Sequence, residues 1–99
     1  LAGVVVAFHA HLAAEKALKA TVVRRSVTLQ RTHDLARLLQ LLPVEDADRF
    51  ELADLILLNP WSIAGRYPAD IDDPDGDELD LIAAAAGRTV VVAMVICGR

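Results

Sequence analysis

The stretch AFHAHLAAEKALKATVV, residues 7–23, decides the fold of this chain because it is long, rich in helix-forming residues and free of Gly and Pro. With the valines before it, it predicts a helix over roughly Val4 to Val23. At about 100° per residue, one broad side of this helix collects Val6, Ala7, Ala10, Ala13, Ala14, Ala17, Leu18 and Ala20. Small side chains let a second helix approach closely, so we expect this side at the centre of a helical bundle. The other side carries His9, His11, Glu15, Lys16 and Lys19.

Two shorter helices are expected in the middle of the chain. The second has Thr32 as its N-cap and Asp34 in its first turn, and Pro43 ends it. Its apolar side consists of Leu35, Leu38, Leu39 and Leu42. A third helix is expected from near Asp46 to the break at Asn59-Pro60. Its apolar positions are Phe50, Ala53, Ile56 and Leu57.

A final long helix is expected over Asp77 to Cys97, with Gly98 as its C-cap. Before it, residues 61–66 can form one more helical turn, and the acidic stretch 69–77 is expected to be an exposed loop. The segment TVVVAMVI at 89–96 is rich in β-branched residues, so a buried strand is the alternative there. The alanines at 83–86 lead directly into it and favour the helix. The predicted fold is all-α, an up-and-down bundle of four main helices with an additional short helical turn.

Composition bounds the class of protein. The chain has 99 residues, enough for a single domain spanning residues 1–99 with one modest core. Hydrophobic residues make up 55% of it but only four are aromatic, so the core is built from Leu, Val and Ala. Residues 1–37 carry a net charge of +4 and residues 38–99 one of -8, an asymmetry that can attract phosphate to one face.

The cysteine count and the hydropathy of the chain indicate where in the cell we expect the protein. The single Cys97 cannot form an intramolecular disulfide, so we expect a cytoplasmic protein. The apolar run from Leu81 to Cys97 is shorter than the roughly 20 residues of a membrane helix and contains Arg88, so we expect a buried helix and no membrane. The chain starts at Leu1 and lacks the basic start of a signal peptide, and we expect further residues before it.

Three blocks of sequence resemble one known family. They are FHAHLAAEKALKA at Phe8–Ala20, RTHDLARLL at Arg31–Leu39, and AGRYPAD at Ala64–Asp70. Their order and spacing are similar to those of HEPN (higher eukaryotes and prokaryotes nucleotide-binding) domains. In that family an FxAxxAAEKALKA helix is followed by a T-H-D/N-L helix start and an A-R-Y-P turn. The resemblance implies a helical bundle, commonly dimeric, often encoded beside a small nucleotidyltransferase in toxin and antitoxin pairs. Some members cleave RNA and others are thought to bind nucleotides.

The chain departs from the family pattern at two points. Where the family has a glutamine pair after FxA, this chain has His11 and Leu12. Catalytic HEPN proteins have an Arg, four to six residues and then a His, and no Arg precedes any of the three histidines at that spacing. Without that motif the sequence offers no general base paired with an Arg that stabilises phosphate. We therefore predict no catalytic residues.

Candidate ligand-binding residues come from the same blocks. They are Glu15, Lys16, Lys19, His33, Asp34, Arg66 and Tyr67. Glu15 and Lys19 can equally be an ordinary surface pair on a helix, and Lys16 with Lys19 can face phosphate near Arg24 and Arg25. His33 at a helix start needs a carboxylate partner if it is charged, because the helix dipole is positive there.

Arg66 and Tyr67 precede Pro68, which restrains their direction, and Arg66 can pair with Asp34 or Glu15. Trp61 is expected to plug the core rather than stack on a base. No metal site is predicted, because the chain has one Cys, its closest histidines diverge on a helix, and its acidic loop lacks the EF-hand pattern. No cofactor is predicted either.

These observations predict a nucleotide- or RNA-linked binding module that pairs with a minimal nucleotidyltransferase. The alternatives are an RNA-cleaving toxin that needs no metal and a purely structural helical adaptor. A homodimer is also expected, because the first and last helices carry more apolar surface than a four-helix bundle can bury.

Overall fold

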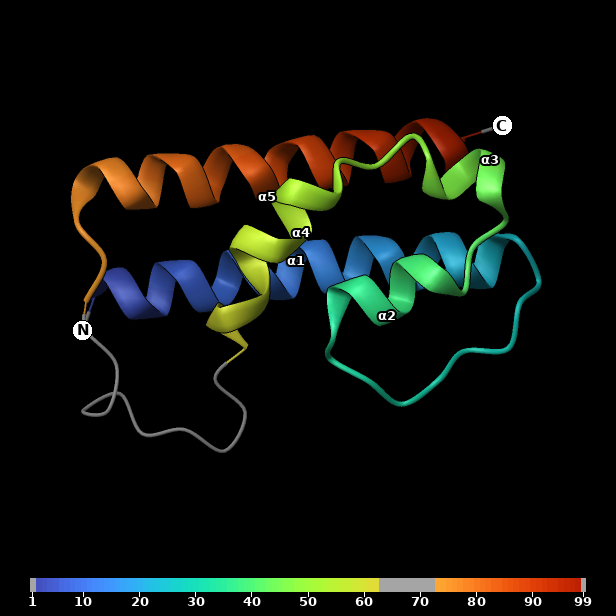
Figure 1. Cartoon of the computed structure of the whole chain (residues 1–99), viewed down its shortest axis with the longest axis horizontal. Coiled ribbons are helices and arrows are strands. Elements are labelled where there is room, and N and C mark those ends of the chain that lie inside the picture. The colour runs from blue at the N-terminus through green and yellow to red at the C-terminus, as the bar shows by residue number, and fades with distance from the viewer. Residues whose placement is uncertain (1, 63–72, 99) are drawn as a thin grey trace.

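The computed structural model describes residues 2–62 and 73–98 of the chain, and every regular element in that part is helical. The elements are α1 (Ala2–Arg24), α2 (Leu35–Gln40), α3 (Val44–Ala47), α4 (Leu52–Leu58), the 3₁₀ helix η1 (Asn59–Trp61) and α5 (Gly76–Cys97). The two long helices lie side by side and run in the same direction, with the short helices packed along one side of the pair (Figure 1). The all-α fold expected from the sequence is confirmed.

Contacts at both ends fix the parallel arrangement of α1 and α5. Near their starts, the backbone N–H of Val4 donates to Asp73 just before α5, over 2.9 Å. A Cβ at Gly3 would lie 3.0 Å from both Asp73 carboxylate oxygens and from the Pro74 carbonyl, so this close approach requires glycine. Near their ends, the Thr21 hydroxyl lies 3.9 Å from the Cys97 sulfur.

The buried side of α1 is rotated from the one expected. Ala7, Ala14 and Leu18 are fully buried as predicted, but Val6 is 50% exposed and Ala13 and Ala20 are exposed too. The buried side extends instead over His11 and Glu15, at 1% and 3% exposure. The expectation that these two lie on an outer, polar side was wrong. Hydrogen bonds from Lys19 and His33 reduce the cost of burying Glu15, and Glu15 itself lies 3.8 Å from His11 Nδ1.

The start of α2 also differs from the expected one. Asp34, not Thr32, is the N-cap, and its carboxylate accepts hydrogen bonds from the backbone N–H groups of Ala36 and Arg37. The Thr32 hydroxyl accepts from the Asp34 N–H over 3.1 Å and so stabilises the turn that precedes the cap. Leu35 and Leu38 are buried as the leucine spacing predicted.

The third predicted helix is two helices, α3 and α4. Phe50 and Leu55 are both buried, at 7% and 0% exposure, although residues five apart on a straight helix point about 140° away from each other. The break between Ala47 and Leu52 lets both side chains reach the core. The helix ends before Asn59-Pro60 and continues as η1, where Trp61 is 9% exposed, as expected for a core plug.

Helix α5 confirms the helix expected for TVVVAMVI and starts one residue earlier than predicted. Asp75 caps it by accepting from the Glu78 N–H over 2.8 Å, and Gly98 is the C-cap. Its buried side includes Ile82, Ala85, Ala86, Ala93 and Ile96. Thr89 is buried among them because its hydroxyl bonds back to the Ala85 carbonyl over 2.9 Å.

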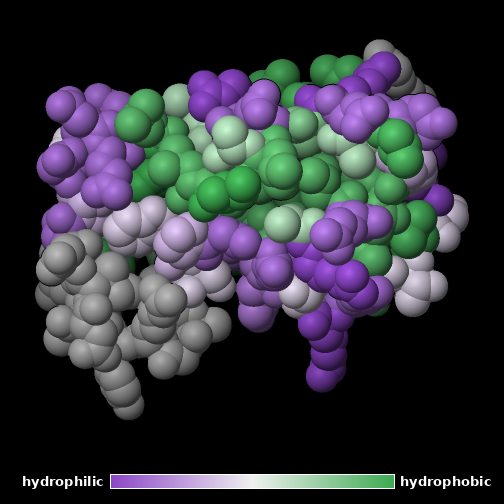
Figure 2. Space-filling view, viewed as in Figure 1, coloured by the Kyte–Doolittle hydropathy of each residue, from purple (hydrophilic) through white to green (hydrophobic). Residues whose placement is uncertain are grey.

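The other side of α5 is not covered, so the expected buried helix is buried only in part. Four large apolar side chains on α5 are 46–66% exposed, namely Leu81, Val91, Met94 and Val95. Figure 2 shows apolar residues gathered across the upper half of the viewed face of the molecule, where α5 lies in Figure 1, with polar residues around them. Among the described residues, α5 is the one helix that by length and composition could cross a membrane, a test that core helices of soluble proteins also pass. Arg88 in its middle pairs with Asp54 of α4 through two hydrogen bonds of 2.8 Å.

Candidate functional site around Glu15

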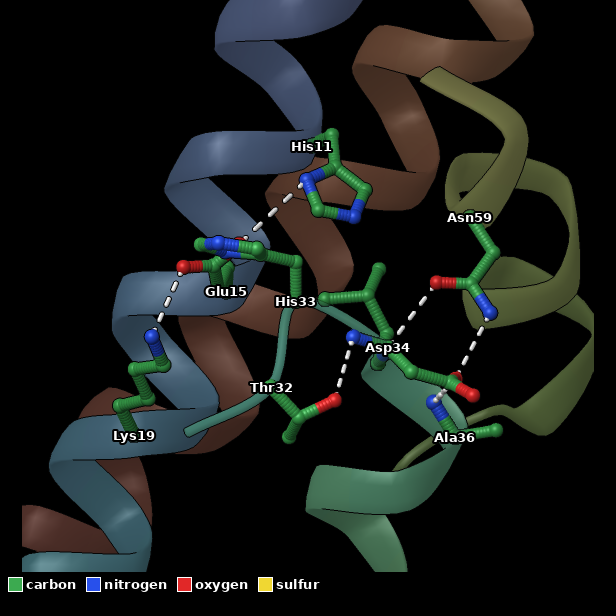
Figure 3. A network of polar contacts seen from close by, with 9 residues as sticks. His11, Glu15, Lys19, Thr32, His33, Asp34, Ala36 and Asn59 are labelled. Atoms are coloured by element: carbon green, nitrogen blue, oxygen red, sulfur yellow. Dashed lines mark hydrogen bonds and ion pairs between the residues drawn. The ribbon is translucent and has the colours of Figure 1, made fainter. Parts of the chain in front are cut away.

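A buried carboxylate on α1 connects that helix to the loop before α2. The side chain of Glu15 is 4% exposed, and its two oxygens accept from Lys19 Nζ at 2.9 Å and His33 Nδ1 at 3.0 Å (Figure 3). Lys19 lies one turn further along α1, and the His33 side chain is 62% exposed. Because Glu15 is buried and its partners face outward, it fixes the direction of a lysine and an imidazole at the surface.

The pKa of Glu15 reflects this arrangement. Burial alone raises the pKa of a carboxyl group, and it is the largest single influence here. The hydrogen bonds from Lys19 and His33, with their charges, together outweigh burial and hold the pKa of Glu15 below its ordinary value. The carboxylate is therefore ionised at neutral pH although it lies in the interior.

His11 lies one turn before Glu15 and is 1% exposed. Its Nδ1 is 3.8 Å from a Glu15 oxygen. Its Nε2 lies near the His33 backbone and Asn59 but makes no hydrogen bond of ordinary geometry within the described part. Burial lowers the pKa of His11, and the nearby Glu15 charge only partly opposes it. His11 is thus a neutral imidazole at neutral pH. We call His11, Glu15, Lys19 and His33 the Glu15 cluster.

Asp34 joins a second group of contacts next to the Glu15 cluster. Asn59, where α4 ends, donates from Nδ2 to the Asp34 carboxylate at 2.9 Å and accepts from the Leu35 N–H at 3.0 Å. The Asn59 bond, followed by those of the helix cap, holds the pKa of Asp34 below its ordinary value. Asn59 thereby joins α4 to the start of α2. Sequence reasoning missed this residue, since Asn before Pro60 indicated only a helix end.

The remaining candidates lie elsewhere. Lys16 lies on another side of α1, beside Ala20 and Cys97. Arg25, expected near a phosphate-facing patch, instead pairs with Asp46 through bonds of 2.6 and 3.1 Å. Arg66 and Tyr67 lie outside the described residues. The structure thus brings together Glu15, Lys19 and His33 and places Asp34 beside them. In residues 2–62 and 73–98, no group of three His, Cys, Asp or Glu side chains is placed to hold a metal ion.

A hollow opens beside the cluster at the surface. It has a volume of about 330 Å³ and is lined by Lys19, Arg31, Thr32 and His33. We call it the cationic hollow, since three of its four lining residues are basic and none is acidic. It lies where the AAEKALKA block of α1 meets the THDL block of the following loop.

Comparison with family models identifies the chain. The HEPN domain model matches residues 4–87, from the start of α1 to the middle of α5. The chain belongs to the HEPN family. A comparison with curated proteins gave no match, and a comparison with solved structures gave none either.

Membership in the HEPN family gives a context for the geometry of the cluster. The family is linked to nucleotide binding and to toxin–antitoxin pairs. In this HEPN domain, Glu15 and His33 come from two separate motif blocks and meet in one hydrogen bond. The contact links the two blocks physically, since Glu15 of the first block orients the His33 side chain of the second.

Proposed function

We propose that this HEPN domain is a binding module that acts with a minimal nucleotidyltransferase in a toxin–antitoxin-like pair, and that it does not itself cleave RNA. Its sequence lacks the Arg and His spacing of catalytic HEPN proteins. The observation that carries the proposal is the uncovered apolar side of α5. A contiguous apolar surface of this kind on a small domain is typical of a protein interface.

Two grooves flank α5 and differ in character. The α4–α5 groove has a volume of about 530 Å³, and its apolar lining includes Val91 and Val92. Charged residues of both signs also line it, namely Arg49, Glu51, Asp54 and Arg88. Apolar residues combined with charged residues of both signs are usual in an interface between different proteins. We assign this groove to the nucleotidyltransferase partner.

The α1–α5 groove has a volume of about 440 Å³. It is lined by Ala13, Lys16, Ala17, Ala20, Val90, Ala93, Met94 and Cys97. Its small side chains allow close approach of another helix pair, and only one of its eight lining residues is charged. We assign this groove to a second copy of the chain, related by a two-fold axis as in most small homo-oligomers.

The proposal expects a minimal nucleotidyltransferase gene beside the gene for this chain, and co-expression of the two proteins tests the partnership. The wild-type chain is expected to co-purify with that protein. Val91→Glu, which puts a charge among the apolar residues that line the α4–α5 groove, is expected to abolish co-purification. Val44→Glu is the matched control, because Val44 is 70% exposed on α3 and lines neither groove. Loss of the complex in both variants, or in neither, contradicts the assignment.

A second candidate function, metal-independent RNA cleavage, is favoured by one observation. Glu15 orients the His33 imidazole beside Lys19 and Arg31, and a carboxylate-oriented imidazole is a common general base. We expect purified protein to leave total RNA intact in the presence of a chelator. Fragments that appear with chelator and disappear in His33→Gln would establish the toxin and overturn the first proposal.

A further inference from the structure

The α4–α5 groove continues along α5 into a second hollow. This hollow has a volume of about 330 Å³ and is lined by Val95 together with Arg49, Val91 and Val92, which also line the groove. The segment that joins α3 to α4 carries Arg49 and runs along the second half of α5 (Figure 1). We call the two hollows together the extended groove. From Ala84 to Val95 it follows α5 for 11 residues, or about 16 Å, which is about three helical turns.

Gly87 lines the extended groove in the middle of α5. Glycine is less favourable than alanine inside a helix, so a helical glycine is often explained by a close contact. At Gly3 that contact is with Asp73 of the same chain. At Gly87 a Cβ would meet no atom within 4 Å in the described part of the chain. Nothing in the described fold therefore requires glycine at this position, whereas another chain could approach the α5 backbone most closely here.

The residues that follow Gly87 on the same side of α5 are apolar and exposed. Val91 is 59% exposed and Val95 is 46% exposed. With Ala84 and Gly87 they repeat at intervals of three or four residues, so they form one ridge along the helix. A partner helix satisfies its own backbone hydrogen bonds, which the surface of α5 cannot supply to an extended segment. The ridge therefore fits the apolar side of a helix.

The charges of the extended groove favour an acidic partner. Arg88 donates to Asp54 from Nε and Nη2 over 2.8 Å, which leaves Nη1 unused, and the Arg88 side chain is 58% exposed. Asp54 and, to a smaller extent, Glu51 raise the pKa of Arg88, so both acidic residues of the groove act on this arginine. Arg49 is exposed, and no side chain in residues 2–62 and 73–98 pairs with its guanidinium. The groove thus has one arginine whose charge is not offset and another with unused donors.

We propose that the extended groove receives an amphipathic helix of a partner protein. The apolar side of that helix lies on Gly87, Val91 and Val95. Its acidic side faces Arg49 and Arg88, because a carboxylate can accept two hydrogen bonds from a guanidinium and so fix the register of the helix. The inference rests on the proposed function, which assigns the α4–α5 groove to the nucleotidyltransferase, and it names the kind of segment that this partner inserts.

Two probes test the extended groove on the whole chain. One is the co-expressed nucleotidyltransferase. The other is a synthetic amphipathic helix with leucines at i, i+3, i+4 and i+7 and glutamates on both flanks, compared with a counterpart that has lysines in place of the glutamates. Calorimetry measures the affinity of each peptide, and the methyl signals of Val91 and Val95 in NMR spectra report where it binds. We expect the acidic peptide to bind and to shift these signals, and its lysine counterpart to bind at least about tenfold more weakly.

Gly87→Leu is the decisive variant, because its side chain would fill the place of closest approach. It should abolish both peptide binding and co-purification. Its melting temperature should stay at or above that of the wild type, since the new side chain points away from the described atoms of the chain and leucine favours helix. Ala53→Leu is the matched control and should bind like the wild type, because Ala53 is exposed on α4 and lines neither part of the extended groove.

Arg49→Gln tests the charge, and the Arg49 guanidinium has no partner in the described fold that its loss would disturb. It is expected to weaken binding of the acidic peptide by about tenfold, equivalent to about 1.4 kcal/mol. Arg37→Gln is the control for this variant and should leave the affinity unchanged, since Arg37 is an exposed arginine that bonds Gln30 and Gln40 outside the extended groove.

The helix site is overturned if Gly87→Leu binds the peptide like the wild type, if the two peptides bind equally, if the two arginine variants weaken binding equally, or if the wild-type chain binds neither probe. Dissociation of the homodimer by Gly87→Leu would also overturn it, because a second copy would then occupy the groove. Co-purification that survives Gly87→Leu keeps the partnership and removes the helix from this groove. Peptide binding without co-purification keeps the helix site and removes the nucleotidyltransferase as its partner.

Discussion

Glu15 and His33 are 18 residues apart in the sequence, and their side chains meet in a 3.0 Å hydrogen bond that joins α1 to the loop before α2. The carboxylate is buried while the imidazole is exposed, so the pair connects the interior of the domain with its surface. Lys19 completes the arrangement on the other carboxylate oxygen. The position of the cationic hollow therefore depends on a group inside the helix packing.

Replacing Glu15 by Ala is expected to destabilise the domain by about 1 to 3 kcal/mol, because the change removes two hydrogen bonds and leaves a space beside His11. The figure stays below that of a fully buried ion pair, since Lys19 and His33 are partly exposed. Urea denaturation measures the change in the free energy of unfolding. Lys16→Ala, one residue further along α1 and exposed, should change it by less than about 0.5 kcal/mol. An equally small change in the free energy of unfolding for both variants would mean that Glu15 lies at the surface.

Stability is expected to fall as the pH drops below neutral. The pKa of His11 is lowered from 6.5, so the unfolded chain takes up a proton at this residue before the folded chain does. Stability from neutral His11 is thus complete above about pH 6.5 and is lost progressively below it. The pKa of Glu15 is lowered from 4.5, so its contribution is complete above that pH and is lost as the pH falls further.

Urea denaturation at a series of pH values tests the role of His11. His11→Gln keeps a polar side chain of similar size but cannot take up a proton. It should therefore flatten the dependence of stability on pH between about pH 7 and pH 5. His9→Gln is the control, because His9 is exposed on the same helix. An unchanged slope in His11→Gln assigns the pH dependence to other groups.

Neighbouring alanines on α1 are expected to respond differently to enlargement. Ala14 is fully buried in the core, so Ala14→Leu overpacks the core and should cost about 1 to 3 kcal/mol. Ala13 is exposed in the α1–α5 groove, so Ala13→Leu should leave the stability of the single chain within about 0.5 kcal/mol. Denaturant melts at low protein concentration compare the two. A larger loss of stability in Ala13→Leu than in Ala14→Leu would mean that α1 buries the small-residue side that its sequence predicts.

The rotation of α1 shows where sequence reasoning stops. Helical periodicity predicted both long helices to within two residues at their ends, because their runs lack internal breaks other than Gly87. Periodicity treats every ionisable residue as external, so it placed His11 and Glu15 outside. Their burial depends on Lys19 nearby and on His33 from a distant block, and a single sequence does not display that pairing. A comparable long-range contact, between Asn59 and Asp34, was missed for the same reason.

The break between α3 and α4 has a similar cause. Local propensity permits a continuous helix from Asp46, whereas the core needs Phe50 and Leu55 on one side. Tertiary packing therefore overrides the local preference. The buried leucines of α2 and the C-cap Gly98 of α5 could be predicted from the sequence, because they depend on residues only a few positions away. For the candidate site, the motif blocks predicted which residues take part, whereas only the structure shows which of them bond to one another.

Self-association through the α1–α5 groove is the last prediction. Two-fold pairing would cover Met94, which is 66% exposed, together with the small side chains beside it. Sedimentation at micromolar concentration is expected to give a dimer for the wild-type chain. Met94→Glu should give a monomer, since pairing through this groove would bury two unpaired charges in the interface.

The matched variants decide which surface is used. Val44→Glu introduces the same charge on α3 outside both grooves and should remain a dimer. Val91→Glu lies in the α4–α5 groove, so it should also remain a dimer while losing the nucleotidyltransferase. The opposite result is a monomer for Val91→Glu and a dimer for Met94→Glu. It would assign the α4–α5 groove to the second copy and the α1–α5 groove to the nucleotidyltransferase. A wild-type monomer at every concentration would exclude the symmetric interface and leave the apolar side of α5 to the partner protein alone.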